Sequence, residues 1–159
     1  MSSNFDQPSF IVSEVDITYR NHVPYNERIS VKKSYTAFQI LRQSWDENKI
    51  ELLEQFKILL LDRKSNCLGI SEISTGGTSS CIVDPKIVFA TALKAKASGL
   101  ILAHNHPSGN LVASDADLAL TKKLIDGGKL LDIAIIDHLI ITAQDFYSFS
   151  DNGVMPNPS

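Results

Sequence analysis

Two histidines, His104 and His106, stand two residues apart in this chain, and Ser114 and Asp117 follow shortly after them. Two imidazoles and a carboxylate are the three protein ligands that a catalytic zinc ion requires, with a fourth position left open for water. Nitrogen and oxygen donors without a thiolate suit zinc, although iron, manganese and cobalt also bind such sets. We therefore expect one Zn²⁺ per chain, bound by His104, His106 and Asp117.

The two histidines lie at the end of an apolar run, Leu100 to His104, that is typical of a buried strand. Side chains two residues apart on a strand point to the same face of the sheet. Pro107 favours extended backbone at His106, which keeps this alternation intact past the end of the strand. The sequence thus predicts that both imidazoles face the same side.

Asp117 falls in the first turn of a predicted helix that Ser114 opens. It lies on the same helical stripe as Leu120 and Leu124, which would direct its carboxylate toward the protein interior. An alternative is purely structural, because Ser114 and Asp117 also have the spacing of a capping box. The Ser114 hydroxyl has two possible roles, one as the helix cap and one as a hydrogen-bond donor to an oxyanion.

Water activated by zinc usually needs a nearby carboxylate that takes and returns its proton. Glu72 is the candidate from the sequence, since it lies on the predicted strand Cys67 to Ser74 in step with Leu68 and Ile70. That alternation predicts a side chain directed toward the core, and Glu is otherwise depleted in strands. The alternative is an exposed glutamate without catalytic function. The segment Thr75–Thr78 is a candidate flap near Glu72.

Apolar periodicity and turn residues predict the order of the remaining elements. They favour an α/β (α+β) fold with a single mixed sheet flanked by helices. Residues 1–33 are expected to form an N-terminal extension with one strand, 34–150 a domain, and 151–159 a flexible tail. The predicted strands cover 10–19, 56–62, 67–74, 80–83, 100–104 and 131–141, and the predicted helices 34–54, 85–98 and 114–125, the last ending at Gly127-Gly128.

Composition and local patterns limit the classes of protein to which the chain can belong. The chain has a formal charge of −3 and lacks the basic surface of a dedicated nucleic-acid binder, so nucleic-acid binding is unsupported but not excluded. The N-terminal residues show no secretory signal, and no apolar run is long enough to span a bilayer. Cys67 and Cys81 lack the spacing of a metal-binding pair and are expected to be reduced thiols, which indicates a cytoplasmic protein. Nothing in the sequence indicates an oligomeric state.

The residues His104-x-His106, Ser114 and Asp117, with Glu72 upstream, resemble the JAMM motif of the JAB/MPN metallopeptidases. The stretches 103–109, 131–133 and 147–149 and the pair Asp137-His138 are similar to the RadC-like branch of that superfamily. The resemblance covers about residues 34–150.

This resemblance implies a curved mixed sheet similar to the cytidine-deaminase architecture. It implies zinc ligation by His104, His106 and Asp117, with Glu72 as general acid/base and Ser114 as a hydrogen-bond donor in the transition state. Related proteins cleave peptide or isopeptide bonds, whereas others are non-catalytic scaffolds. Longer RadC-like chains, which carry a DNA-repair label, have an N-terminal helix-hairpin-helix segment that the region before residue 34 does not match.

Two functions follow as expectations. The first is a zinc-dependent hydrolase of amide bonds in a peptide or protein substrate that the sequence does not name. The second is a binding module that keeps the metal site without activity. His138, the partner of Asp137 in the family pair, is expected to make hydrogen bonds rather than to bind metal. A zinc deaminase is excluded, because it needs a glutamate two residues after the first ligand and a C-x-x-C pair.

Overall fold

Five strands lie side by side in one mixed sheet in the computed structural model, which describes residues 7–159. The order across the sheet is β2-β1-β3-β4-β5. β3 and β4 run parallel, and the other neighbours run antiparallel. The predicted α/β fold with one mixed sheet is confirmed. The strands are β1 (Gln55–Leu61), β2 (Cys67–Thr75), β3 (Gly99–Asn105), β4 (Ala134–Ile141) and β5 (Phe146–Ser148).

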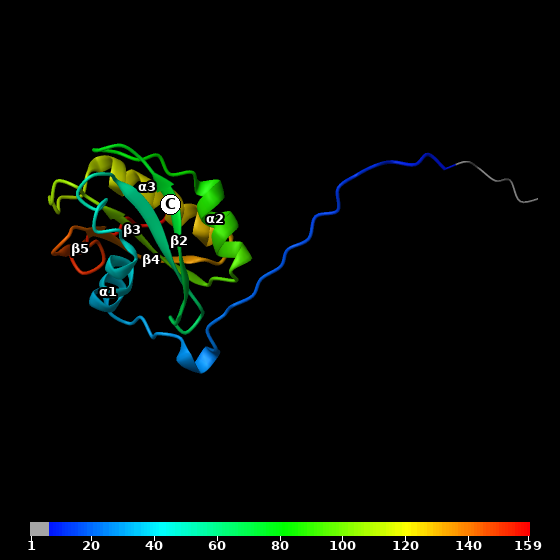
Figure 1. The fold of residues 1–159 in the computed structure, drawn as a ribbon, viewed down its shortest axis with the longest axis horizontal. Coiled ribbons are helices and arrows are strands. Elements are labelled where there is room, and N and C mark those ends of the chain that lie inside the picture. Colours follow the sequence, from blue (N-terminus) through cyan, green and yellow to red (C-terminus); the bar gives the residue numbers. More distant parts are fainter. Residues whose placement is uncertain (1–6) are drawn as a thin grey trace, which may run out of the picture.

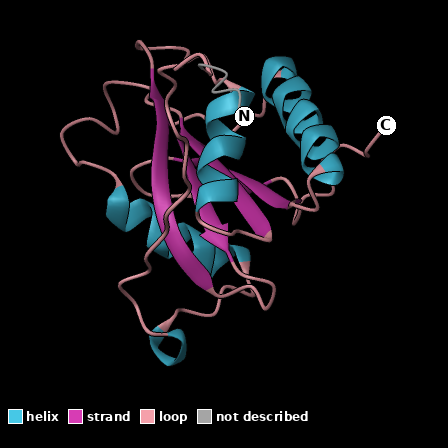
Figure 2. Cartoon of the chain, turned by 90° about the vertical axis from the view of Figure 1, so that its right-hand side faces the viewer, coloured by secondary structure: helices cyan, strands magenta, loops and turns pink. Residues whose placement is uncertain are grey.

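Helices cover both faces of this sheet (Figures 1 and 2). α1 (Ser34–Ser44) packs on one face, and α2 (Pro85–Lys94) and α3 (Asp115–Leu130) pack on the other. Each face buries its own apolar cluster, because successive strand residues alternate between the two sides. The α1 face includes Leu41, Trp45, Leu59, Ile101 and Leu139, and the α2–α3 face includes Phe56, Ile58, Val88, Leu102 and Leu124.

Three predicted segments differ in the structure. Residues 10–19 are extended but pair with no strand of the described chain, and they project away from the domain (Figure 1). Residues 46–52 form turns rather than a continuation of α1, and residues 80–83 form a loop rather than a strand. A β-rich sequence becomes a strand only where a partner backbone lies beside it, and the sequence does not show where that partner is.

α3 continues to Leu130, past the Gly127-Gly128 pair at which the sequence predicts its end. The two glycines serve close packing instead. A Cβ on Gly128 would lie 2.3 Å from the carbonyl oxygen of Ile133, and a Cβ on Gly127 would lie 2.8 Å from the ring of Phe89. A side chain at position 128 would therefore displace the backbone after α3, and one at position 127 would displace the Phe89 ring.

The chain returns to α3 at its C-terminus. The residues expected to be a flexible tail end with Ser159, whose backbone N–H donates to the Asp126 carboxylate on α3 at 2.8 Å. Along residues 7–159, none of the helices is both long and apolar enough to cross a membrane.

Candidate metal centre

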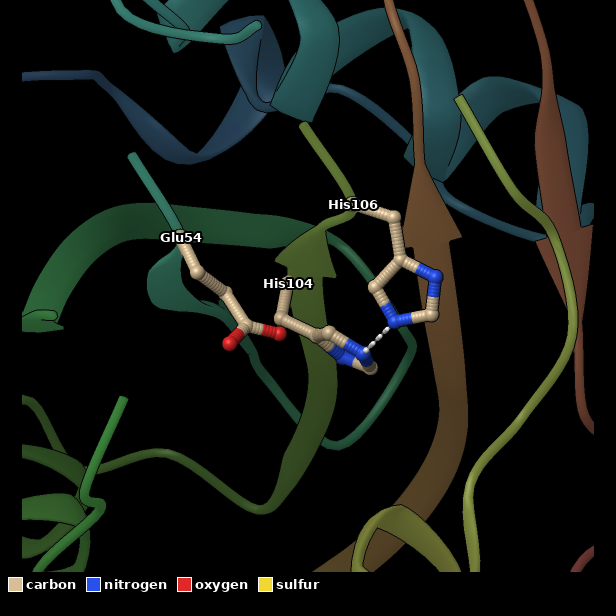
Figure 3. Close-up of side chains that lie close together, drawn as sticks. All are labelled: Glu54, His104 and His106. Atoms are coloured by element: carbon tan, nitrogen blue, oxygen red, sulfur yellow. Dashed lines mark hydrogen bonds between the residues drawn. The ribbon is translucent and has the colours of Figure 1, made fainter. Parts of the chain in front are cut away.

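His104 and His106 meet at the end of β3, on the face that α2 and α3 cover. Their Nε2 atoms lie 3.0 Å apart (Figure 3). His104 is buried, whereas His106 is partly open to solvent. The Nδ1 atom of His106 lies 2.7 Å from the carbonyl oxygen of Asn110. A carbonyl only accepts hydrogen bonds, so Nδ1 carries the proton and Nε2 of the neutral His106 ring offers a lone pair.

Asp117 reaches both imidazoles from the first turn of α3. Its Oδ2 atom lies 3.3 Å from Nε2 of His104 and 3.7 Å from Nε2 of His106. The same residue also closes the capping box, in which Ser114 Oγ accepts from the backbone N–H of Asp117 and Asp117 Oδ2 accepts from that of Ser114, both at 3.0 Å. Asp117 therefore closes the helix cap and also contacts the histidines, because the cap fixes the position of its carboxylate.

The carboxylate that joins this group belongs to Glu54. One ligand atom from each of Glu54, His104 and His106 lies within 4.8 Å of the others (Figure 3). Glu54 precedes β1, and β1 pairs antiparallel with β3 so that Phe56 lies opposite His104. Extending that register by two residues brings Glu54 opposite His106. The sequence does show an acidic residue directly before a buried strand, but not that this strand pairs with β3.

Glu72 lies elsewhere, and the prediction that it points into the core is wrong. β2 skips one residue against β1 at two places, one of them at Leu68. As a result Leu68 packs on the α2–α3 face and Ile70 on the α1 face, which breaks the alternation on which the prediction depends. Glu72 pairs with Lys57, whose ammonium group reaches the end of α1, and its side chain is exposed. It therefore lies on the opposite face of the sheet from His104.

Asn105, between the two histidines, points to the other face and is fully buried. Its amide nitrogen donates to the carbonyl oxygens of Ile50 and Leu53, at 2.7 and 2.8 Å, and its amide oxygen accepts from the backbone N–H of Gln55 at 2.7 Å. These three bonds hold the backbone on both sides of Glu54. The residue pattern alone did not indicate this role for Asn105.

His138 on β4 stands behind the centre and is fully buried. Its Nε2 atom lies 2.8 Å from Nδ1 of His104, and its Nδ1 atom lies 2.7 Å from Oγ1 of Thr121. The ring stacks on Phe149, with centroids 4.5 Å apart, and meets Phe56 edge-on at 5.8 Å. The expectation that His138 makes hydrogen bonds agrees with these contacts.

The electrostatics of the site follow from these contacts. Burial raises the pKa of Asp117, but the two imidazoles beside its carboxylate lower it by a larger amount, so this pKa lies well below its usual range. The Asp117 carboxylate beside His106 raises the pKa of this histidine. Burial raises the pKa of Glu54 and lowers that of His138, which keeps the His138 ring neutral.

A cleft of about 410 Å³ opens over this group. Ser114 and Asp117 line it from α3, the residues after His106 line one wall, and the loop before α2 lines another, including Cys81. Both cysteines are free thiols in the structure, as predicted. The segment Thr75–Thr78, proposed as a flap near Glu72, runs from the end of β2 into this loop, and Thr78 lines the cleft together with Glu54. The two histidines therefore lie in the lining of a cleft that is open to solvent.

Comparison with known proteins agrees with this arrangement. The family model of the RadC-like JAB domain matches residues 31–154, which is most of the chain. The chain belongs to the RadC-like JAB domain family. The resemblance drawn from the histidine motif is thereby confirmed at the level of the family.

Among the relatives of this RadC-like JAB domain, a UPF0758 protein of Flavobacterium johnsoniae is 46% identical over 101 residues. That match covers 64% of the chain and 44% of the relative. A UPF0758 protein of Syntrophomonas wolfei is 43% identical over 102 residues, which is 64% of the chain and 43% of the relative. One of Protochlamydia amoebophila is 38% identical over 128 residues, which is 80% of the chain and 54% of the relative. The chain spans about half the length of the relatives it matches.

Proposed function

We propose that this RadC-like JAB domain is a zinc-dependent hydrolase of amide bonds in a peptide or protein substrate. The observation that carries the proposal is the convergence of His104, His106 and Asp117 beside the buried carboxylate of Glu54, at an open cleft. Family membership supports the same reaction class.

The residues present suit a divalent cation. Nε2 of the neutral His106 ring offers a lone pair, and it faces Nε2 of His104 at 3.0 Å and Oδ2 of Asp117 at 3.7 Å. Electron-rich atoms this close repel one another unless a proton or a metal cation lies between them. Two imidazoles and a carboxylate match the ligands of catalytic zinc. Bound zinc would polarise a substrate carbonyl and make water a stronger acid.

Glu54 takes the role of general acid/base in this proposal. It lies next to the histidines and its buried side chain has a raised pKa, so it can hold a proton taken from water and pass it to the leaving amine nitrogen. Ser114 Oγ accepts the backbone N–H of Asp117, which leaves its own hydroxyl proton free. Ser114 also lines the cleft, so this proton can be donated to the oxyanion of the attacked carbonyl.

Metal content tests the first half of the proposal. We expect about one zinc per chain, measured by elemental mass spectrometry on protein purified without chelator. His106→Ala and Asp117→Asn should lose it, and His22→Ala, which changes an exposed histidine, should keep it. Wild-type protein that takes up no zinc, even when zinc is added, would contradict the proposal.

Turnover tests the second half. The zinc-loaded chain is screened against linear and branched (isopeptide-linked) peptide libraries, and cleavage is followed by mass spectrometry. Glu54→Gln should reduce the rate by at least about 10²-fold, the typical contribution of general acid–base catalysis, while Glu72→Gln should keep it. A chain that binds zinc but cleaves none of these peptides would indicate a non-catalytic metal-binding module.

A further inference from the structure

We propose that Thr121 and His138 are positioning residues that fix which nitrogen of His104 carries its proton. This inference rests on the proposed metal site and concerns how the chain prepares one of its ligands. The three residues come from α3, β4 and β3, and their side chains form one continuous line of hydrogen bonds behind the centre.

Thr121 determines which atom donates in each hydrogen bond of this series. Thr121 Oγ1 lies 2.6 Å from the carbonyl oxygen of Asp117, one helical turn earlier on α3. That oxygen can only accept, so the single hydroxyl proton of Thr121 must be donated to it. The Thr121 oxygen is then left to accept, and its other neighbour at 2.7 Å is Nδ1 of His138. His138 therefore carries its proton on Nδ1.

The next step reaches the metal ligand. His138 is fully buried, which favours its neutral ring, so with a proton on Nδ1 its Nε2 has only a lone pair. Nδ1 of His104, 2.8 Å away, must donate to that lone pair. The neutral His104 ring then has no proton on Nε2, the nitrogen that faces His106 and Asp117. His104 is thereby held in the form that can bind a cation.

Packing prevents the line from reversing. The His138 ring stacks on Phe149 and meets Phe56 edge-on, and these contacts keep Nδ1 beside Thr121 and Nε2 beside His104. If the donors and acceptors were exchanged, Thr121 would donate its hydroxyl proton to Nδ1 of His138. Two buried oxygens, those of Thr121 and the Asp117 carbonyl, would then face each other at 2.6 Å without a proton between them, an arrangement that costs free energy.

Asp117 is thus used at two points. Its carboxylate contacts His104 from the cleft, while its backbone carbonyl sets the proton order that reaches His104 from behind. A displacement of the first turn of α3 would disturb both contacts at once. This coupling explains why a threonine, and not merely a small apolar residue, lies at position 121 in the buried side of α3.

The test compares Thr121→Val, which removes the hydroxyl at nearly constant shape, with Thr121→Ser, which keeps it. Ring tautomers are read from ¹⁵N chemical shifts and couplings of the histidines in metal-free protein near neutral pH. We expect the Nδ1–H form of His104 in the wild type and in Thr121→Ser, and loss of this single form in Thr121→Val. A wild-type His104 that carries its proton on Nε2 would overturn the inference, whether or not the chain binds zinc.

Zinc affinity, measured by competition with a chromophoric chelator, gives the second readout. Thr121→Val should bind zinc about 10- to 100-fold more weakly than the wild type, the usual effect of losing a partner behind a metal ligand. Thr121→Ser should stay close to the wild type. Unchanged tautomer and affinity in Thr121→Val would contradict the inference. If valine prevents folding, Thr121→Ala removes the same hydroxyl with less bulk, and the same criteria apply.

Discussion

The side chain of Asn105 accepts a hydrogen bond from the backbone N–H of Gln55 at 2.7 Å, although the two residues are 50 positions apart in the chain. Asn105 lies between the two histidines, and Gln55 follows Glu54. One amide thus ties the strand that carries the imidazoles to the segment that carries the buried carboxylate. The relative position of these groups depends on this contact.

Replacement of Asn105 should therefore lower stability more than its size suggests. Asn105→Ala leaves the N–H of Gln55 and the carbonyls of Ile50 and Leu53 without their partner, and unpaired buried polar groups cost about 1–3 kcal/mol each. We expect a loss of about 3 kcal/mol in the free energy of unfolding, measured with urea. Asn48→Ala, at an exposed position in the preceding loop, should change it by less than about 0.5 kcal/mol. Equal effects of both changes would contradict this assignment.

The pairing of His106 with Asp117 predicts a pH dependence of the metal-free protein. The folded pKa of His106 is raised above its ordinary value of 6.5, mainly by the Asp117 carboxylate beside it. Its contribution to stability is thus fully present below pH 6.5 and is lost as the pH rises through the folded pKa. We expect the free energy of unfolding of the wild type to fall as the pH rises above 6.5. Asp117→Asn should show a smaller fall, and identical slopes would argue against the pairing.

Zinc should stabilise the folded chain, because the ligands come from two separate elements, β3 and α3, that meet only on folding. At a free zinc concentration of 100 times the Kd, the expected gain in unfolding free energy is about 2.7 kcal/mol. Denaturant unfolding with and without zinc measures it, and removal of zinc by a chelator should reverse it. His106→Ala should show no gain; a gain of the same size in that variant would place the binding elsewhere.

Gly128 is expected to be irreplaceable for a steric reason. A Cβ there would lie 2.3 Å from a backbone oxygen of Ile133, so Gly128→Ala must displace the segment that leads from α3 into β4. Overpacking of this kind costs about 1–3 kcal/mol, which thermal unfolding can detect. Gly69→Ala is the control, because a Cβ at Gly69 meets nothing within 4 Å. A Gly128→Ala variant as stable as Gly69→Ala would disprove this account.

Patterns among residues close together in the sequence were sufficient to predict much of the site. Alternation along a strand placed His104 and His106 on the same side, and the capping pattern placed Ser114 and Asp117 at the start of a helix. The β1–β2 hairpin, the helix after Asp84 and the buried strand before the histidines were predicted for the same reason. Each of these features depends on interactions between residues close together in the chain.

The tertiary structure decided which carboxylate joins the histidines. Glu54 lies beside them because β1 pairs with β3 in a register that no local pattern specifies. Glu72 lies on the opposite face because β2 skips residues against β1, and a one-residue shift reverses the side to which a strand residue points. The contacts of His138 with His104 and Thr121 likewise join three elements that meet only in the folded chain. Sequence spacing determines local direction, whereas register between distant segments is set by the packing of the whole sheet.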